Sequence, residues 1–346
     1  MLRFEIKKVF SKRMNQLAML ILLAIVLIGS FLTINDVKYI EADGTTISGI
    51  LAGRKLKKAQ NAWKGELTEE VLREIQTINS EINAEAKASG ISPDTIEYDK
   101  VAAKKQGFQE ISDMIGRAFV EFDGFDYFRS DSVGEDEVGA LYERRISSLK
   151  EYLEREDIKN TISEKEKEYL INQWESLKTP FHYEYAGGWK AILDSQYVPT
   201  LMTILAVILG FLVAGIFSDE FQLRADSIFF SARHGRDKAV LAKVGAGVCI
   251  ATIVYWGTVL LYSLLVLGAL GFGGASCPVQ CGYSSWNSIY NFTYIQDYLF
   301  TTIGGYVGSM AILLTEMFVS AKSRSTAIAI VVPIVLACVP MFLGRI

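Results

Sequence analysis

The stretch Leu17–Ile34, LAMLILLAIVLIGSFLTI, decides the fold class because it runs without a charged residue. A helix of about 20 apolar residues crosses the bilayer core, which is about 30 Å thick. Four later blocks of the chain are similarly apolar, so the signal is this uneven distribution rather than the overall hydrophobic content of 50%. We therefore predict an all-α integral membrane protein with about five transmembrane helices. They are predicted at residues 15–34, 198–217, 239–270, 298–320 and 326–343.

Residues 1–14 precede the first span and are rich in Lys and Arg. A signal peptide is the alternative, but the apolar stretch is too long for one and no small-x-small cleavage site follows it. A helix over these residues would have one apolar face, formed by Leu2, Ile6, Val9 and Phe10. The pattern predicts an uncleaved anchor preceded by a cytoplasmic amphipathic elbow helix that lies in the headgroup plane.

Basic residues also set the predicted orientation. They recur in residues 1–14, in the linker of residues 218–238 and in the short loop 321–325. Residues 271–297 contain none. Because loops rich in Lys and Arg stay in the cytoplasm, the N-terminus and both basic loops are predicted to be cytoplasmic. Residues 35–197 then form a large extracytoplasmic domain, and residues 271–297 an extracytoplasmic loop.

The predicted extracytoplasmic domain is strongly acidic and reads as mainly helical. Ser163 with Glu166 makes a capping-box pattern, and Thr68 followed by two acids is a typical helix start. Apolar spacing predicts a further helix over residues 135–154. The aromatic run at residues 181–189, FHYEYAGGW, predicts a short strand with a turn at its two glycines.

Catalytic and metal-binding patterns are sparse. The two histidines, His182 and His234, fall on opposite sides of the membrane in the predicted topology, which excludes a His-based triad or a two-His metal site within one chain. The sequence has no Gly-Lys dipeptide, so it lacks a Walker A loop for ATP. We predict that the chain is not an enzyme and has no catalytic, cofactor-binding or metal-binding residues of its own.

Two features leave alternatives open. Cys277 and Cys281 lie in the predicted outer loop, where they form either a local disulfide or, as we favour, remain unbonded. Glu316 is the one acid well inside a predicted span, which points to an ion or proton path. The alternative, which we favour, is that its carboxylate simply reaches the headgroup region.

Small residues mark two candidate packing faces in the spans. Gly210 with Ala214, and Gly304 with Gly308, are small-x-x-x-small pairs that let helices approach closely. Such pairs are common in membrane spans. Packing within the chain and packing against a partner are therefore both open.

The linker between the second and third spans has an amphipathic pattern. Phe221, Ala225, Ile228 and Ala232 are spaced 4, 3 and 4 residues apart, which gives one apolar face. A helix with such a face needs the membrane surface or a protein groove to cover it.

This linker resembles that of ABC-2 type (type V) ABC transporter permeases, in which an acid after the second span begins a coupling helix that docks into the ATPase subunit. Glu220 takes the place of the acid, SIFFSA at 227–232 that of the hydrophobic run, and RDKAVLAK at 236–243 that of the entry to the third span. The order of elements is also similar to that family: elbow, span, outer domain, span, coupling helix, and then a cluster of spans.

The resemblance implies a transmembrane permease subunit of an ATP-driven exporter, with peptides, antimicrobials or lipids as candidate substrates. ATP and Mg would bind a separate ABC ATPase subunit, and a second permease copy or paralogue would complete the pathway in a bacterial plasma membrane. No nucleic acid is implied as a partner. The residues implied in ATPase coupling are Glu220, Phe221, Arg224, Ile228, Phe229, Phe230, Arg233 and Arg236.

Three departures from the family stand out. Its usual Gly-Thr is replaced near Arg224 and Ala225, and its usual proline near the turn is Arg233. The family has six spans, with a re-entrant hairpin before the last, whereas five are predicted here. The first two departures affect the expected docking geometry rather than the existence of the coupling helix.

Two other classes share parts of this pattern. A mechanotransmitting permease has a large outer domain after its first span but only three spans beyond it. A receptor or sensor with an extracytoplasmic helical domain would need a cytoplasmic output domain, and no predicted inner loop is long enough. The acidic outer domain either concentrates cationic substrates or, as we favour, is a soluble cap over the pathway exit.

Overall fold

The structure is a computed structural model that describes the chain except for residues 92–96, 125, 195–197, 225–237, 283–284 and 344–346 and the side chains of 337–343. The chain divides into two compact units. Unit 1 comprises Met1–Thr33, Ile192–Val266 and Leu299–Ile346, and unit 2 comprises Ile34–Ala191 and Leu267–Tyr298. Each unit is described by itself below.

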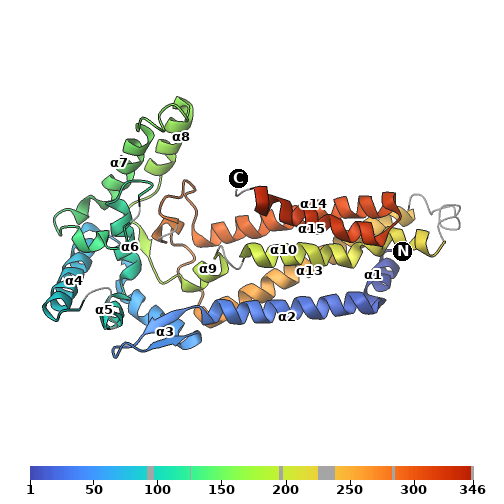
Figure 1. Ribbon diagram of the computed structural model, residues 1–346, viewed down its shortest axis with the longest axis horizontal. Helices are drawn as coiled ribbons and strands as arrows, with labels where there is room; N and C mark the ends of the chain where they lie inside the picture. The colour runs from blue at the N-terminus through green and yellow to red at the C-terminus, as the bar shows by residue number, and fades with distance from the viewer. Residues whose placement is uncertain (92–96, 125, 195–197, 225–237, 283–284, 344–346) are drawn as a thin grey trace. The chain divides into compact units, whose positions relative to one another are not determined.

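Unit 1 is built from long apolar helices, which in Figure 1 run in roughly the same direction. Among the described residues, four helical stretches are long and apolar enough to cross a membrane: Arg13–Asn35, Val198–Gln222, Lys238–Leu270 and Tyr294–Ser323. These helices indicate membrane insertion and confirm four of the predicted spans as helices. The elements are α1 (Leu2–Ser11), α2 (Arg13–Asn35), α10 (Val198–Val213), α11 (Gly215–Gln222), α13 (Lys238–Leu270), α14 (Tyr294–Ser323) and α15 (Thr326–Leu343).

The last predicted span, residues 326–343, is also a helix, α15. Its described apolar stretch, Thr326–Leu336, is shorter than the other four. It packs along α10 and α11. The number of membrane crossings therefore stays a prediction.

Polar contacts join the long helices of unit 1 at intervals. The Thr33 hydroxyl of α2 lies 2.8 Å from the Tyr262 hydroxyl of α13. The Tyr255 hydroxyl of α13 donates to the Thr302 carbonyl of α14 at 2.7 Å. Polar contacts between helices of an apolar bundle favour one helix register.

Unit 2 is mainly helical, as predicted for residues 35–197. Its helices are α3 (Ile50–Gln60), α4 (Glu69–Ala88), α5 (Tyr98–Lys105), α6 (Gln109–Ala118), α7 (Leu141–Leu153), α8 (Glu164–Glu175) and α9 (Gly187–Ile192). Short 3-10 turns lie at Asn61–Trp63, Arg129–Ser132, Val138–Ala140 and Val279–Cys281. Two small antiparallel sheets pair β1 (Lys38–Ile40) with β2 (Thr46–Ser48) and β3 (Gly65–Glu66) with β4 (His182–Tyr183).

The helix starts predicted in unit 2 are confirmed. Ser163 and Glu166 form a complete capping box at the start of α8, and the Thr68 hydroxyl accepts a hydrogen bond from the Val71 amide at the start of α4. These contacts satisfy amide groups that have no partner within their own helix.

Two other local predictions in unit 2 were partly wrong. Residues 135–154 do not form one helix, because α7 begins only at Leu141 after a 3-10 turn. The strand predicted in the aromatic run is present as β4, but its two glycines open α9 instead of forming a turn. In both cases part of the predicted backbone conformation was wrong: residues before Leu141 form a 3-10 turn, and Gly187 and Gly188 are helical.

The core of unit 2 joins helices and the long loop that follows α13. Its buried side chains come from α4, α6, α7 and the segment around β4, and include Ile75, Ile111, Leu141, Phe181 and Trp286. A second cluster lies between α7 and α8, which run side by side in Figure 1. There the Arg145 guanidinium stacks 3.9 Å from the ring centre of buried Trp174.

Candidate functional site

The candidate site lies in unit 1 at the end of α11, the helix that leads into the predicted coupling segment. Asp219 and Glu220 sit in its last turn. The helix ends at Leu223, whose amide donates to the Asp219 carbonyl, and Arg224 follows with a φ of 54°. This left-handed backbone favours glycine, so the chain turns sharply here at a residue that adopts the conformation at some cost.

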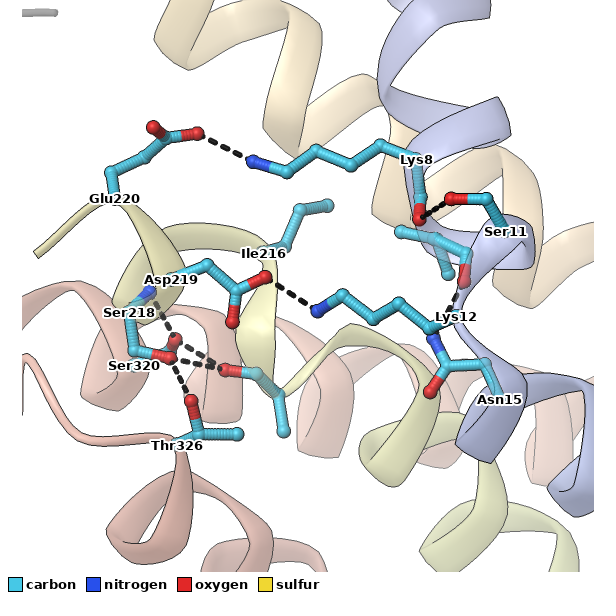
Figure 2. Close-up of polar contacts among 12 residues, drawn as sticks. Lys8, Ser11, Lys12, Asn15, Ile216, Ser218, Asp219, Glu220, Ser320 and Thr326 are labelled. Atoms are coloured by element: carbon cyan, nitrogen blue, oxygen red, sulfur yellow. Dashed lines mark hydrogen bonds and ion pairs between the residues drawn. The ribbon is translucent and has the colours of Figure 1, made fainter. Parts of the chain in front are cut away.

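Glu220 connects three helices. Its Oε1 atom accepts from Lys8 Nζ of α1 at 2.7 Å, which Figure 2 shows, and from Lys243 Nζ of α13 at 2.9 Å. Its side chain is 16% exposed. Two ammonium groups from helices far apart in sequence therefore converge on one carboxylate.

Lys243 is the most buried charge in this cluster, with a side chain that is 0% exposed. Besides Glu220, its ammonium donates to Glu5 Oε2 of α1 at 3.2 Å and to the Ile216 carbonyl of α11 at 2.9 Å. Three acceptors match the three donors of an ammonium group. A buried lysine with these partners ties α13 to both α1 and α11, because moving α13 away would take a buried charge from these acceptors.

Asp219 forms a second connection to α1. Its Oδ2 atom lies 2.5 Å from Lys12 Nζ, as Figure 2 shows. Gly215 makes room for this pair, since a Cβ atom there would lie 2.6 Å from Lys12 Nζ and 2.6 Å from Asp219 Oδ1. A larger residue at this position would push the two charged groups apart.

Asn15 holds the bend between α1 and α2. The backbone at Lys12 is extended, with φ −75° and ψ 125°, which separates the elbow helix from the span. The Asn15 side-chain amide donates to the Val9 carbonyl at 2.9 Å and to the Leu212 carbonyl of α10 at 3.1 Å. The bend is thus tied to the neighbouring span.

Hydroxyl groups hold the opposite side of α11 (Figure 2). Ser218 Oγ lies 2.6 Å from Thr326 Oγ1 of α15. Ser320 Oγ of α14 accepts from the Ser218 amide at 3.2 Å and donates to the Ala214 carbonyl at 2.6 Å. The short helix α11 is therefore bound to α1, α13, α14 and α15 by polar contacts.

The structure describes three of the eight residues predicted to couple to an ATPase. Glu220 lies in the charged cluster, Phe221 packs its ring 4.9 Å from the Arg324 guanidinium, and Arg224 is exposed. The other five, Ile228, Phe229, Phe230, Arg233 and Arg236, lie outside the described residues. The coupling helix itself stays a prediction.

Sequence reasoning did not identify the partners of Glu220. Lys8 and Lys12 were assigned to the headgroup region, but both pair with carboxylates of α11. A helix over residues 1–14 would place both on one face, which was the available signal, although α1 ends at Ser11. Lys243 was noted only as the end of the family-like motif.

Cys277 and Cys281 of unit 2 are free thiols, so the structure does not contain the disulfide considered for them. Their sulfur atoms lie against different carbonyls, Cys277 against Glu184 and Cys281 against His182, each at 3.8 Å. Burial raises the pKa of the Cys277 thiol to about 11, which keeps it protonated and unreactive at neutral pH.

No group of three His, Cys, Asp or Glu side chains in the described part of the chain is placed to hold a metal ion. Comparisons with protein-family models, curated proteins and solved structures found no match for this sequence.

Proposed function

We propose that the chain is the transmembrane permease subunit of an ATP-driven ABC transporter of the ABC-2 type, working as an exporter. The observation that supports this most is the ion-pair cluster around Glu220. It lies at the position where the family resemblance expects force from an ATPase subunit to enter the membrane helices.

The cluster explains how such a force would spread. A push on residues 225–237 would reach both α11 and α13, because this segment lies between them in the chain. Lys8 and Lys12 would carry the displacement to α1, and Lys243 to α13. Packed helices joined in this way move as rigid bodies between discrete arrangements, which suits alternating access.

The backbone at Arg224 supports the same assignment. ABC-2 permeases usually carry Gly-Thr near this point, and the left-handed φ of 54° is the conformation that glycine favours. Arg224 thus takes up a turn of the kind that glycine would provide in the family. Replacing the family's glycine by Arg224 therefore does not require a different backbone conformation.

The proposed topology places residues 1–14, 218–238 and 321–325 in the cytoplasm of a bacterium and residues 35–197 outside its plasma membrane. ATP and Mg bind to the separate ATPase. A second permease copy or a paralogue lines the other half of the pathway. Candidate substrates are peptides, antimicrobials or lipids, and the extracytoplasmic domain of residues 35–197 serves as a soluble cap.

Co-purification tests this function. The full chain is isolated in detergent together with its ABC ATPase subunit, and ATP hydrolysis by the complex is measured. Phe229→Asp is expected to abolish ATPase binding, because an acid would replace an apolar contact in the docking helix. Tyr127→Asp is the matched control, since Tyr127 is 76% exposed in unit 2. Retention of the ATPase by both variants would contradict the proposal.

A further inference from the structure

Glu316 of α14 is enclosed in unit 1 rather than directed to the headgroup region. The residue is 0% exposed, and neither carboxyl oxygen has a hydrogen-bond partner among the described residues. Gly210 of α10 and Pro333 of α15 close over it: a Cβ atom at Gly210 would lie 2.5 Å from Glu316 Oε2 and 2.5 Å from Pro333 Cγ. The headgroup interpretation of the sequence was therefore wrong, because three helices pack around the carboxyl group.

The ionised form of this carboxyl does not fit its surroundings. A charged side chain in a membrane bundle needs an opposite charge, a hydrogen-bond donor or water. α10 and the described part of α15 carry no titratable residue. On α13, Lys243 is paired with Glu5 and Glu220, and Lys238 is exposed. The other titratable residues of this helix are Cys249, Tyr255 and Tyr262.

Other charged groups near this end of the bundle lie on α11 and α14. Asp219 and Glu220 of α11 are held by lysines. Lys322 of α14 lies six residues along the same helix, near the Phe318 ring. No described cation is therefore hydrogen-bonded to the Glu316 carboxyl.

A metal cation does not fit the site either. Cations such as Na⁺ or Ca²⁺ need several oxygen ligands, whereas Gly210 and Pro333 offer carbon atoms to the carboxyl group. The nearest hydroxyl along this face of α14 belongs to Ser320, one turn away, and it is bound to α11. A proton is the ligand that needs no further partner.

We propose that Glu316 is a proton-binding site of unit 1, and that the proton is held while α10 and α15 pack against α14. Release of the proton leaves a carboxylate, which must then meet water or a cation. Because Gly210 and Pro333 cover the carboxyl, that step requires these helices to separate. Proton release and opening of the helix packing are thereby coupled.

A group of hydroxyl contacts lies one turn from Glu316, toward the end of α11. Ser320 lies four residues beyond Glu316 on the same face of α14, and it contacts Ser218, which in turn contacts Thr326. These contacts hold α11 on the side away from its lysine pairs. The helix that carries Glu316, α14, therefore also holds α11 in place through Ser320.

Carbodiimide labelling of the full chain in detergent tests this site. N,N′-dicyclohexylcarbodiimide is apolar and reacts with protonated carboxyl groups in apolar surroundings. We expect one adduct, on the peptide containing Glu316, with a yield that falls as pH is raised from 6 to about 9. Glu316→Gln should lose this adduct. A water-soluble carbodiimide with an added amine should label exposed acids and leave Glu316 unmodified.

Two results would overturn the proposal. One is labelling of Glu316 by the water-soluble reagent with no adduct from the apolar one, which would show an ionised and accessible carboxylate. The other is protection by Na⁺ but not by choline at constant pH, which would show a metal cation site instead.

Thermal unfolding supplies an independent measurement. If the packed state holds the proton more tightly than the unfolded state, stability must fall as pH rises. An unfolded glutamate has a pKa of about 4.3, so the Tm of the wild type should then decrease more between pH 5 and pH 9 than the Tm of Glu316→Gln, which carries no proton to lose. Equal decreases in both proteins would contradict proton binding at Glu316.

Discussion

Glu220 and Glu316 are both shielded acids of unit 1, but they meet opposite surroundings. Glu220 accepts from Lys8 and Lys243, which belong to two other helices. In the described part of the chain, Glu316 has no hydrogen-bond partner, and it lies under Gly210 and Pro333. An acid such as Glu220 joins helices where lysines reach it. An acid such as Glu316, without a cation nearby, favours its neutral form and depends on close helix packing.

The largest expected effect comes from breaking the charged cluster. Lys243→Met leaves Glu5 and Glu220 without their buried cation, and breaking a buried pair typically costs about 3–5 kcal/mol. We expect a clear fall in Tm of the full chain in detergent. Lys238→Met, on the same helix at an exposed position, is the control and should leave Tm nearly unchanged.

A double variant sharpens this test. In Lys243→Met with Glu220→Gln, a neutral amide replaces the carboxylate that lost one of its two lysines, so part of the lost stability should return. Strictly additive losses from the two substitutions would show that Lys243 and Glu220 do not act as a pair.

The second prediction concerns the packing over Glu316. Gly210→Ala places a methyl group 2.5 Å from Glu316 Oε2 and from Pro333 Cγ, which forces the helices apart. Overpacking of this kind costs about 1–3 kcal/mol. Gly304→Ala is the matched control on α14, because a Cβ atom there meets nothing within 4 Å. Equal Tm values for the two variants would contradict close packing at Gly210.

The third prediction tests the hydroxyl side of α11. Thr326→Val keeps the shape of the side chain but removes the partner of Ser218 Oγ, at a cost of about 1 kcal/mol. Thr315→Val is the control, since Thr315 is exposed and its hydroxyl bonds only to the Ala311 carbonyl of its own helix. Thermal unfolding of both variants should separate them by a small but measurable Tm difference.

The sequence predicted the helical architecture well and the site only in part. Apolar runs and capping patterns depend on neighbouring residues, so the long helices and the capping box at Ser163 could be read directly. The partners of Glu220 could not, because Lys8 lies 212 positions away and meets it only through helix packing. The small pairs show the same limit: Gly210 is covered by two helices, whereas Gly304 faces open space.

Glu316 shows why a single pattern gave two interpretations. Its place near the end of an apolar run is compatible with reaching the headgroups or with facing the bundle interior. The direction of the side chain around the helix decides between them. That direction follows from the contacts with α10 and α15, which no local pattern in α14 specifies.

Asp113 of α6 in unit 2 is an intermediate case, because this acid is partly buried and has one hydrogen-bond donor. Burial raises its pKa to about 6, although a hydrogen bond from Gln109, at 2.8 Å, opposes the shift. The folded state therefore binds the proton more tightly than the unfolded state does. The sign follows: its contribution to stability falls as pH rises from about 4 to about 6, and the penalty persists at neutral pH.

Asp113→Asn removes this penalty, and because the side chain is only partly buried we expect a gain below about 1 kcal/mol at pH 7. The gain should vanish near pH 4, where the wild-type carboxyl is protonated in the folded state. Tm measured for the full chain across this pH range checks the effect, with Asp136→Asn at an exposed position as control. A gain that is equal at both pH values would show that Asp113 acts through packing rather than through its charge. Burial would then not be what distinguishes Asp113 from Glu220, whose carboxylate is paired with lysines.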